Sequence, residues 1–210
     1  MLDPRRLQAA EAEFLTRFPK GFADPEMEKI GKKHRMGPMI EFARESFSKP
    51  ALAGNVHIAA DNMVKAVSRS SMVSLFEKPK FRDFVKAMDE HEKAFLVQAL
   101  SEMLHGKQAA GFTAMVDLLK TAKLAKWSLV TIIPAYYKPT REVFVKPTTA
   151  KGVLKFFDIE DPVYHPTPTW DFYRKYRKLI NDAKKQVDKN LSPSNAAFSG
   201  FLMMTVLPGR

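Results

Sequence analysis

The sequence contains no cysteine among its 210 residues. Without thiols the chain can form no disulfide framework, no Cys-ligated zinc or iron–sulfur site and no cysteine nucleophile. The absence of cysteine agrees with a reducing compartment, and we therefore expect a cytoplasmic location.

Long uninterrupted apolar stretches are also missing. Residues 1–20 mix charged and apolar side chains, which is unlike a secretory signal. Residues 190–209 carry no charge, but prolines, serines and an asparagine interrupt them. The continuous apolar part is shorter than the about 20 residues needed to cross a bilayer. We therefore expect no signal peptide, no membrane-spanning helix and no membrane partner.

Motifs of common catalytic sites are absent from the sequence. The five histidines form no HExxH pair, no serine lies in GxSxG, and Gly106-Lys107 lacks the rest of a phosphate-binding loop. We predict no enzymatic activity, no cofactor and no metal site.

A weaker hypothesis is a metal-dependent nuclease that uses Asp158, Glu160 and Asp161, three acids in a proline-rich loop. Acids on a loop are more commonly just hydrated.

Helix signals dominate residues 1–126. Asp3-Pro4 and Asp24-Pro25 have the form of helix starts, and Asp89 with Glu92 forms a capping-box pattern. Apolar residues recur at helical spacing from Leu7 to Leu119. The sequence therefore predicts a helical, bundle-like region up to residue 126. It is either continuous with the rest as one domain, which we favour, or separate from a basic region over residues 127–210.

The pattern changes at Trp127. Residues 127–133 are rich in β-branched and aromatic side chains, residues 134–140 contain two prolines, and residues 142–146 read EVFVK. We predict a mainly α fold with a small β-hairpin after residue 126. The element order over residues 89–146 also fits a winged helix, with residues 108–126 as its recognition helix and residues 134–141 as the wing. A long helix from Thr169 and an apolar helix over residues 193–206 complete the expected order.

Positive charge is concentrated near the C-terminus. The chain has a net charge of +11, and residues 127–210 hold 13 basic and 7 acidic side chains. Clustered cations with interleaved aromatic rings are typical of proteins that bind phosphate backbones and stack on bases. We therefore favour DNA or RNA binding through the following residues: Tyr136, Tyr137, Lys138, Arg141, Lys146, Arg174, Lys175 and Lys178. The competing interpretation is that these cations only form the solvated face of an amphipathic helix.

The second function class is protein–protein interaction without catalysis. Residues 196–207 are apolar on nearly every side, and a helix of this kind must be covered by its own core or by a partner. A homo-oligomer held through Phe201–Leu207 is therefore the alternative to nucleic-acid binding.

Overall fold

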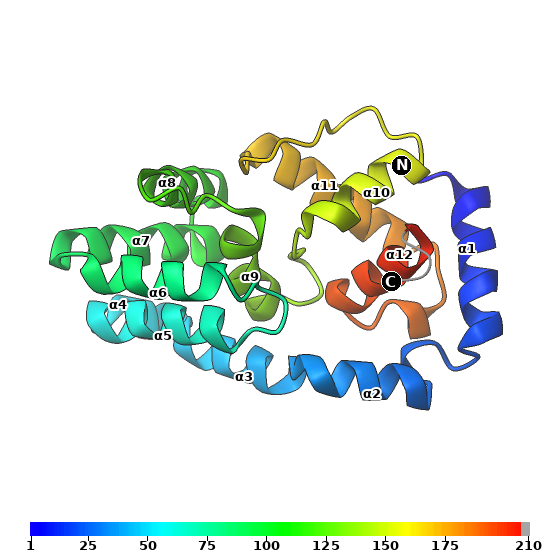
Figure 1. Ribbon diagram of the computed structural model, residues 1–210, viewed down its shortest axis with the longest axis horizontal. Coiled ribbons are helices and arrows are strands. Elements are labelled where there is room, and N and C mark those ends of the chain that lie inside the picture. The colour runs from blue at the N-terminus through cyan, green and yellow to red at the C-terminus, as the bar shows by residue number, and fades with distance from the viewer. Residues whose placement is uncertain (207–210) are drawn as a thin grey trace.

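The chain folds as a set of short helices. The structure is a computed structural model that describes residues 1–206, and Figure 1 shows helices without strands over that range. The α-helices are α1 (Pro4–Arg17), α2 (Pro25–His34), α3 (Met36–Ser46), α4 (Lys49–Ala53), α5 (Val56–Arg69), α6 (Glu77–Ala87), α7 (Glu90–His105), α8 (Gln108–Thr121), α9 (Trp127–Tyr137), α10 (Pro147–Phe156), α11 (Trp170–Lys184) and α12 (Asn195–Val206). Two 3-10 turns, η1 (Gly21–Ala23) and η2 (Lys189–Leu191), lie between them.

Several predicted helix starts are confirmed by their caps. The Asp3 carboxylate accepts hydrogen bonds from the amides of Arg5 and Arg6, and the Asp24 carboxylate accepts one from Glu26. Asp89 and Glu92 form the reciprocal capping box at α7. These caps satisfy amides that have no partner inside the helix, which is why the local sequence identifies them correctly.

The helices form two groups, and α3 and α9 belong to the first of them (Figure 1). In the first group α5 packs on α6 and α7, and α7 packs closely on α8. In the second group α12 packs on α1, α10 and α11. Helix α3 contacts α9, and α8 contacts α11, so that one cluster of buried apolar residues extends from Leu2 to Leu202.

The predicted β-hairpin and winged helix are wrong. Residues 127–137 form α9, in which nine of the eleven residues are buried. An apolar run that is covered on all sides has no alternation to distinguish a strand from a helix, and here the surrounding helices decide for a helix. The wing over residues 134–141 is therefore the end of α9 and a turn, although the predicted helix at residue 108 exists as α8.

The EVFVK segment is extended but has no strand partner in the described part of the chain. The Val145 amide donates to Thr131 Oγ1 at 3.0 Å, and the Val143 amide donates to the Tyr173 hydroxyl at 3.4 Å. Buried amides must have a partner, and here side chains of α9 and α11 take the place of a neighbouring strand.

Within residues 1–206, no helix is both long enough and apolar enough to span a membrane.

Close packing of α7 on α8 depends on Gly111. A Cβ atom at this position would lie 2.5 Å from the Met103 nitrogen and 2.6 Å from the Ala99 oxygen. We predict that Gly111→Ala lowers the free energy of unfolding by about 1–3 kcal/mol, because both neighbours are backbone atoms that can move only with their helix. Gly31→Ala in α2 is the matched control, since no atom lies within 4 Å of that Cβ position. The control should be neutral or stabilising by up to about 1 kcal/mol. Urea unfolding checks both, and equal effects would contradict the packing argument.

Candidate nucleic-acid interface

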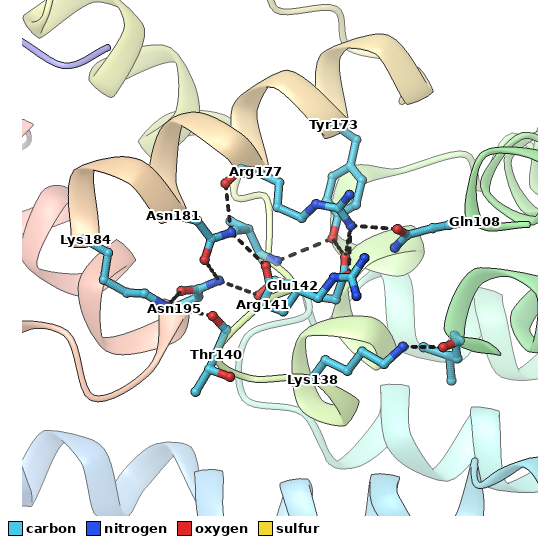
Figure 2. Close-up of polar contacts among 12 residues, drawn as sticks. Gln108, Lys138, Thr140, Arg141, Glu142, Tyr173, Arg177, Asn181, Lys184 and Asn195 are labelled. Carbon is cyan, nitrogen blue, oxygen red and sulfur yellow. Dashed lines mark hydrogen bonds and ion pairs between the residues drawn. The ribbon is translucent and has the colours of Figure 1, made fainter. Parts of the chain in front are cut away.

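A buried carboxylate, Glu142, lies at the centre of the polar residues drawn in Figure 2. Its residue is 2% exposed, and Arg177 Nη1 lies 2.8 Å from one carboxylate oxygen and 2.7 Å from the other. The Tyr173 hydroxyl donates to the same carboxylate at 2.8 Å, and Arg141 Nε lies 3.5 Å from it. Burying a carboxylate is costly, and this cost is offset here by an ion pair and a hydroxyl donor.

The backbone around Glu142 is fixed by amide and ammonium side chains. Asn181 donates to the Arg141 carbonyl at 2.9 Å, and Asn195 donates to the Glu142 carbonyl at 3.1 Å. Lys184 Nζ donates to the Thr140 carbonyl at 2.7 Å. Because these donors come from α11 and α12, the turn after α9 is held against both helices.

Cations outnumber acids at this position. Lys138 and Arg141 flank the turn, Arg177 faces it from α11, and Glu142 pairs with Arg141 and Arg177. Burial lowers the pKa of the Lys138 ammonium; the Glu142 charge opposes this shift, and the Arg141 and Arg177 charges add to it. The Lys138 ammonium donates to the Leu104 carbonyl (Figure 2). The local surplus of positive charge is therefore built into the fold.

The N-terminus of α8 adds to this positive region. Gln108, the first residue of α8, accepts a hydrogen bond from Arg177 Nη1 at 2.8 Å. No side chain within residues 1–206 accepts a hydrogen bond from the first amides of α8, although the Glu102 carboxylate accepts one from the amide of the exposed N-cap residue Lys107 at 2.6 Å. Free amides and the helix dipole favour an anion at such an end. We call Lys107, Lys138, Arg141 and Arg177 the basic cluster.

The aromatic residues expected to stack on bases lie elsewhere. Tyr136 is 0% exposed, and its hydroxyl lies 2.8 Å from Ser70 Oγ. Tyr137 is half-buried and packs edge-on against His105. Tyr136 is therefore closed to bases, whereas the half-buried Tyr137 ring lies beside the basic cluster, with Lys138 Nζ 5.8 Å from its centroid.

The predicted cations divide into three sets. On α11, Arg174 pairs with Asp171 at 2.6 Å, Lys175 with Asp161 at 2.7 Å, and Lys178 with Asp182 at 2.5 Å. Lys146 lies apart from these, with its ammonium 3.7 Å from Met203 Sδ. Lys138 and Arg141 are the two predicted cations that belong to the basic cluster.

The structure does not assemble the three loop acids of the nuclease hypothesis into a metal site. Asp158 pairs with Arg6 at 2.7 Å, and Asp161 pairs with Lys175. Among residues 1–206 no group of three or more candidate ligands is placed to hold a metal ion. Asp158 and Asp161 instead each balance a nearby cation.

The alternative contact, Phe201–Leu207, is largely covered by the chain itself. Phe201 and Leu202 are 0% exposed, and the Phe201 ring packs edge-on against Phe14 at 5.4 Å between centroids. Met203–Val206 are partly buried, and Leu207 lies outside the described residues. The burial of Phe201 and Leu202 inside the chain therefore weakens the argument for a dimer formed through these two residues.

Sequence reasoning missed Glu142 as the centre of this site, together with its partners Arg177, Tyr173 and Asn195. Glu142 is 35 positions from Arg177 and 53 from Asn195. No local pattern connects residues at such separations, so no signal in one sequence could have identified the set.

Comparisons with known proteins return no match: no family model matches the chain, and no curated protein or solved structure is significantly similar. The functional proposals therefore depend on the geometry described above.

Breaking the central ion pair should destabilise the fold. We predict that Glu142→Gln lowers the free energy of unfolding by about 3–5 kcal/mol, because Arg177, which is 15% exposed, loses its charged partner. The double variant Glu142→Leu/Arg177→Met should lose less than Glu142→Gln alone, because it leaves no unpaired buried charge. Urea unfolding of each variant measures this, and a larger loss in the double variant would contradict it.

Tyrosine titration should report the folded state. Burial is the largest cause that raises the pKa of Tyr136, Tyr164, Tyr173 and Tyr176. The folded protein therefore keeps phenol protons that the unfolded chain loses near pH 10. Stability should be intact below that pH and fall as pH rises above it. We expect ultraviolet absorbance of tyrosinate to be well below that of the urea-unfolded chain at the same alkaline pH. Coincident curves would disprove this.

Proposed function

We propose that the protein binds nucleic acid through its phosphate backbone, with the basic cluster as the principal contact, and that it does so in the cytoplasm without catalysis. The observation that carries the proposal is that two arginines, Arg141 and Arg177, pair with the single carboxylate of Glu142, while the Lys138 ammonium of the same turn donates to the Leu104 carbonyl. A phosphate group placed beside Arg141 would meet an unbalanced positive potential. The exposed side of this site is the Arg141 guanidinium, whose side chain is 65% exposed.

The geometry favours contact with the phosphate backbone of the nucleic acid over recognition of its bases. Arg177 is already bound to Glu142 and Gln108, so it supplies charge while Arg141 and Lys107 supply reachable donors. Tyr136 is buried, and the half-buried Tyr137 ring packs against His105 and Lys138. A protein that contacts phosphate without stacking on bases binds with little sequence preference and with strong salt dependence.

The test is fluorescence anisotropy of the full chain with labelled single- and double-stranded DNA and RNA at several salt concentrations. We expect binding at low salt that weakens steeply as salt rises. Arg141→Gln and Lys107→Gln should each weaken binding about threefold to tenfold and lower the salt slope by about one, because each removes one phosphate contact.

Lys29→Gln is the matched control: it removes the same charge from an exposed position on α2, outside the basic cluster. It should leave affinity nearly unchanged. No binding at low salt would refute the proposal. An equal loss in Lys29→Gln and Arg141→Gln would refute the location, because it would reduce the effect to net charge alone.

A further inference from the structure

A large groove lies between α2 and α12 and is lined by none of the residues of the basic cluster. Its volume is about 1250 Å³, and its walls come from α2, the start of α3, α10, α11 and α12. Figure 1 shows α2 along the lower edge of the molecule, with α12 facing it from the second helical group. Lining residues run from Glu26 to Pro38, which is the whole length of α2 and the first turn of α3. The groove is therefore elongated along α2.

The lining is apolar and rich in methionine. Five of the eleven methionines border the groove, together with the rings of Phe22 and Phe144: Met27, Met36, Met72, Met203 and Met204. Methionine side chains are unbranched and polarisable, and they adapt to apolar ligands of different shape. An apolar lining of this extent suits a flexible hydrocarbon chain.

Hydroxyl groups interrupt this apolar lining. The Oγ atom of Ser199 is buried and has no hydrogen-bond partner within residues 1–206. Tyr176 and Thr149, which are 2% and 4% exposed, border the same groove. Burial is the single cause that raises the pKa of the Tyr176 phenol, with no charged or hydrogen-bonding neighbour contributing. A few polar groups in a mostly apolar pocket are typical of sites that orient a small ligand.

The part of the groove beside Lys146 has the features of an anion site. Lys146 is exposed there, and the acceptor nearest its ammonium is the thioether of Met203 at 3.7 Å, a weak one. No ion pair joins Lys146 to an acid in the described residues. Lys146 is also the N-cap of α10, and no side chain of the described chain caps that helix end. An unpaired ammonium and a free helix N-terminus both attract negative charge.

Among the other charged residues that border the groove, positive charges also outnumber negative ones. Arg17, Lys32 and Arg35 border the groove together with Lys146, whereas Glu26 and Glu28 are its bordering acids. An occupant with an anionic group therefore complements the rim, and an apolar body complements the interior.

We propose that this groove binds an amphiphile with a long hydrocarbon chain and an anionic head group, a carboxylate or a phosphate. The chain lies among the methionines, and the head group binds Lys146 and the N-terminus of α10. An oxygen of the head group can accept hydrogen bonds from hydroxyls of the lining. The apolar face of a partner helix would leave Ser199 and Tyr176 without partners, which makes it the poorer occupant.

The test uses a dansyl-labelled fatty acid, titrated into the full chain below its micelle concentration and displaced by unlabelled competitors. Oleate and oleyl phosphate test the two head groups, and oleyl alcohol supplies the same chain without charge. We expect the labelled probe to bind and both anions to displace it more strongly than the alcohol does. Whichever anion displaces at the lower concentration identifies the head group. Failure of both anions to displace the probe, or equal displacement by the alcohol, would overturn the proposal.

Two substitutions on α10 separate a specific head-group contact from general charge. Lys146→Gln should weaken oleate binding about tenfold, because it removes one charge-assisted hydrogen bond, and should leave the alcohol unaffected. Lys155→Gln is the control: it is exposed on the same helix and does not border the groove. It should bind oleate as the unsubstituted chain does. Equal losses in the two variants would overturn the head-group assignment.

Filling the groove tests its interior. Ala197→Trp places a large ring on the groove wall and should abolish probe binding while the circular dichroism melting curve stays cooperative. Full probe binding in a folded Ala197→Trp protein would overturn the location. Light scattering tests the other occupant: a dimer that dissociates in Ala197→Trp would show that a second copy of the chain fills the groove, which would also overturn the proposal. None of these outcomes depends on nucleic-acid binding.

Discussion

The ion pair between Glu142 and Arg177 is the interaction on which the centre of this structure depends. It fixes the turn after α9 to α11, and through Gln108 it also reaches α8. A carboxylate that is 2% exposed has lost most of its hydration, so its partners must remain in place for the fold to persist. The ion pair thereby connects the turn after α9, helix α11 and helix α8, three segments that lie far apart in the chain.

The segment 138–146, a turn followed by residues outside any helix, is held in place by this anchoring. Its carbonyl groups accept from Asn181, Lys184 and Asn195, and its amides donate to hydroxyls of Thr131 and Tyr173. Side chains thus satisfy a buried backbone that would otherwise need a strand beside it. The segment also connects the two helical groups along the chain, because it begins after α9 and ends at α10.

Both proposed sites are built at the ends of this segment. Lys138 and Arg141 lie at its start, beside the buried carboxylate, and Phe144 and Lys146 border the groove at its end. The same rigid backbone therefore positions an anion-attracting surface at each end. The first offers fixed charge with few apolar groups, which suits a phosphate backbone. The second joins one ammonium to an apolar interior, which suits an amphiphile.

Local chemistry allowed the sequence by itself to determine most of the helices. Proline after aspartate, the Asp89–Glu92 capping box and the apolar spacing all act within one or two turns, so they could be read along the chain. The same reasoning correctly placed a long helix after Thr169 and an apolar helix near the C-terminus. Net charge and the lack of cysteine are likewise properties of composition.

Tertiary structure alone decided the state of residues 127–146 and the location of both candidate sites. Trp127–Tyr137 is apolar on every side, so only the helices packed around it determine that it is a helix. Glu142 became the centre of a site because Arg177 and Tyr173 reach it from another element, and Lys146 faces a groove because α2 and α12 meet there. Such contacts join residues tens of positions apart, and they depend on packing and desolvation that no local pattern encodes.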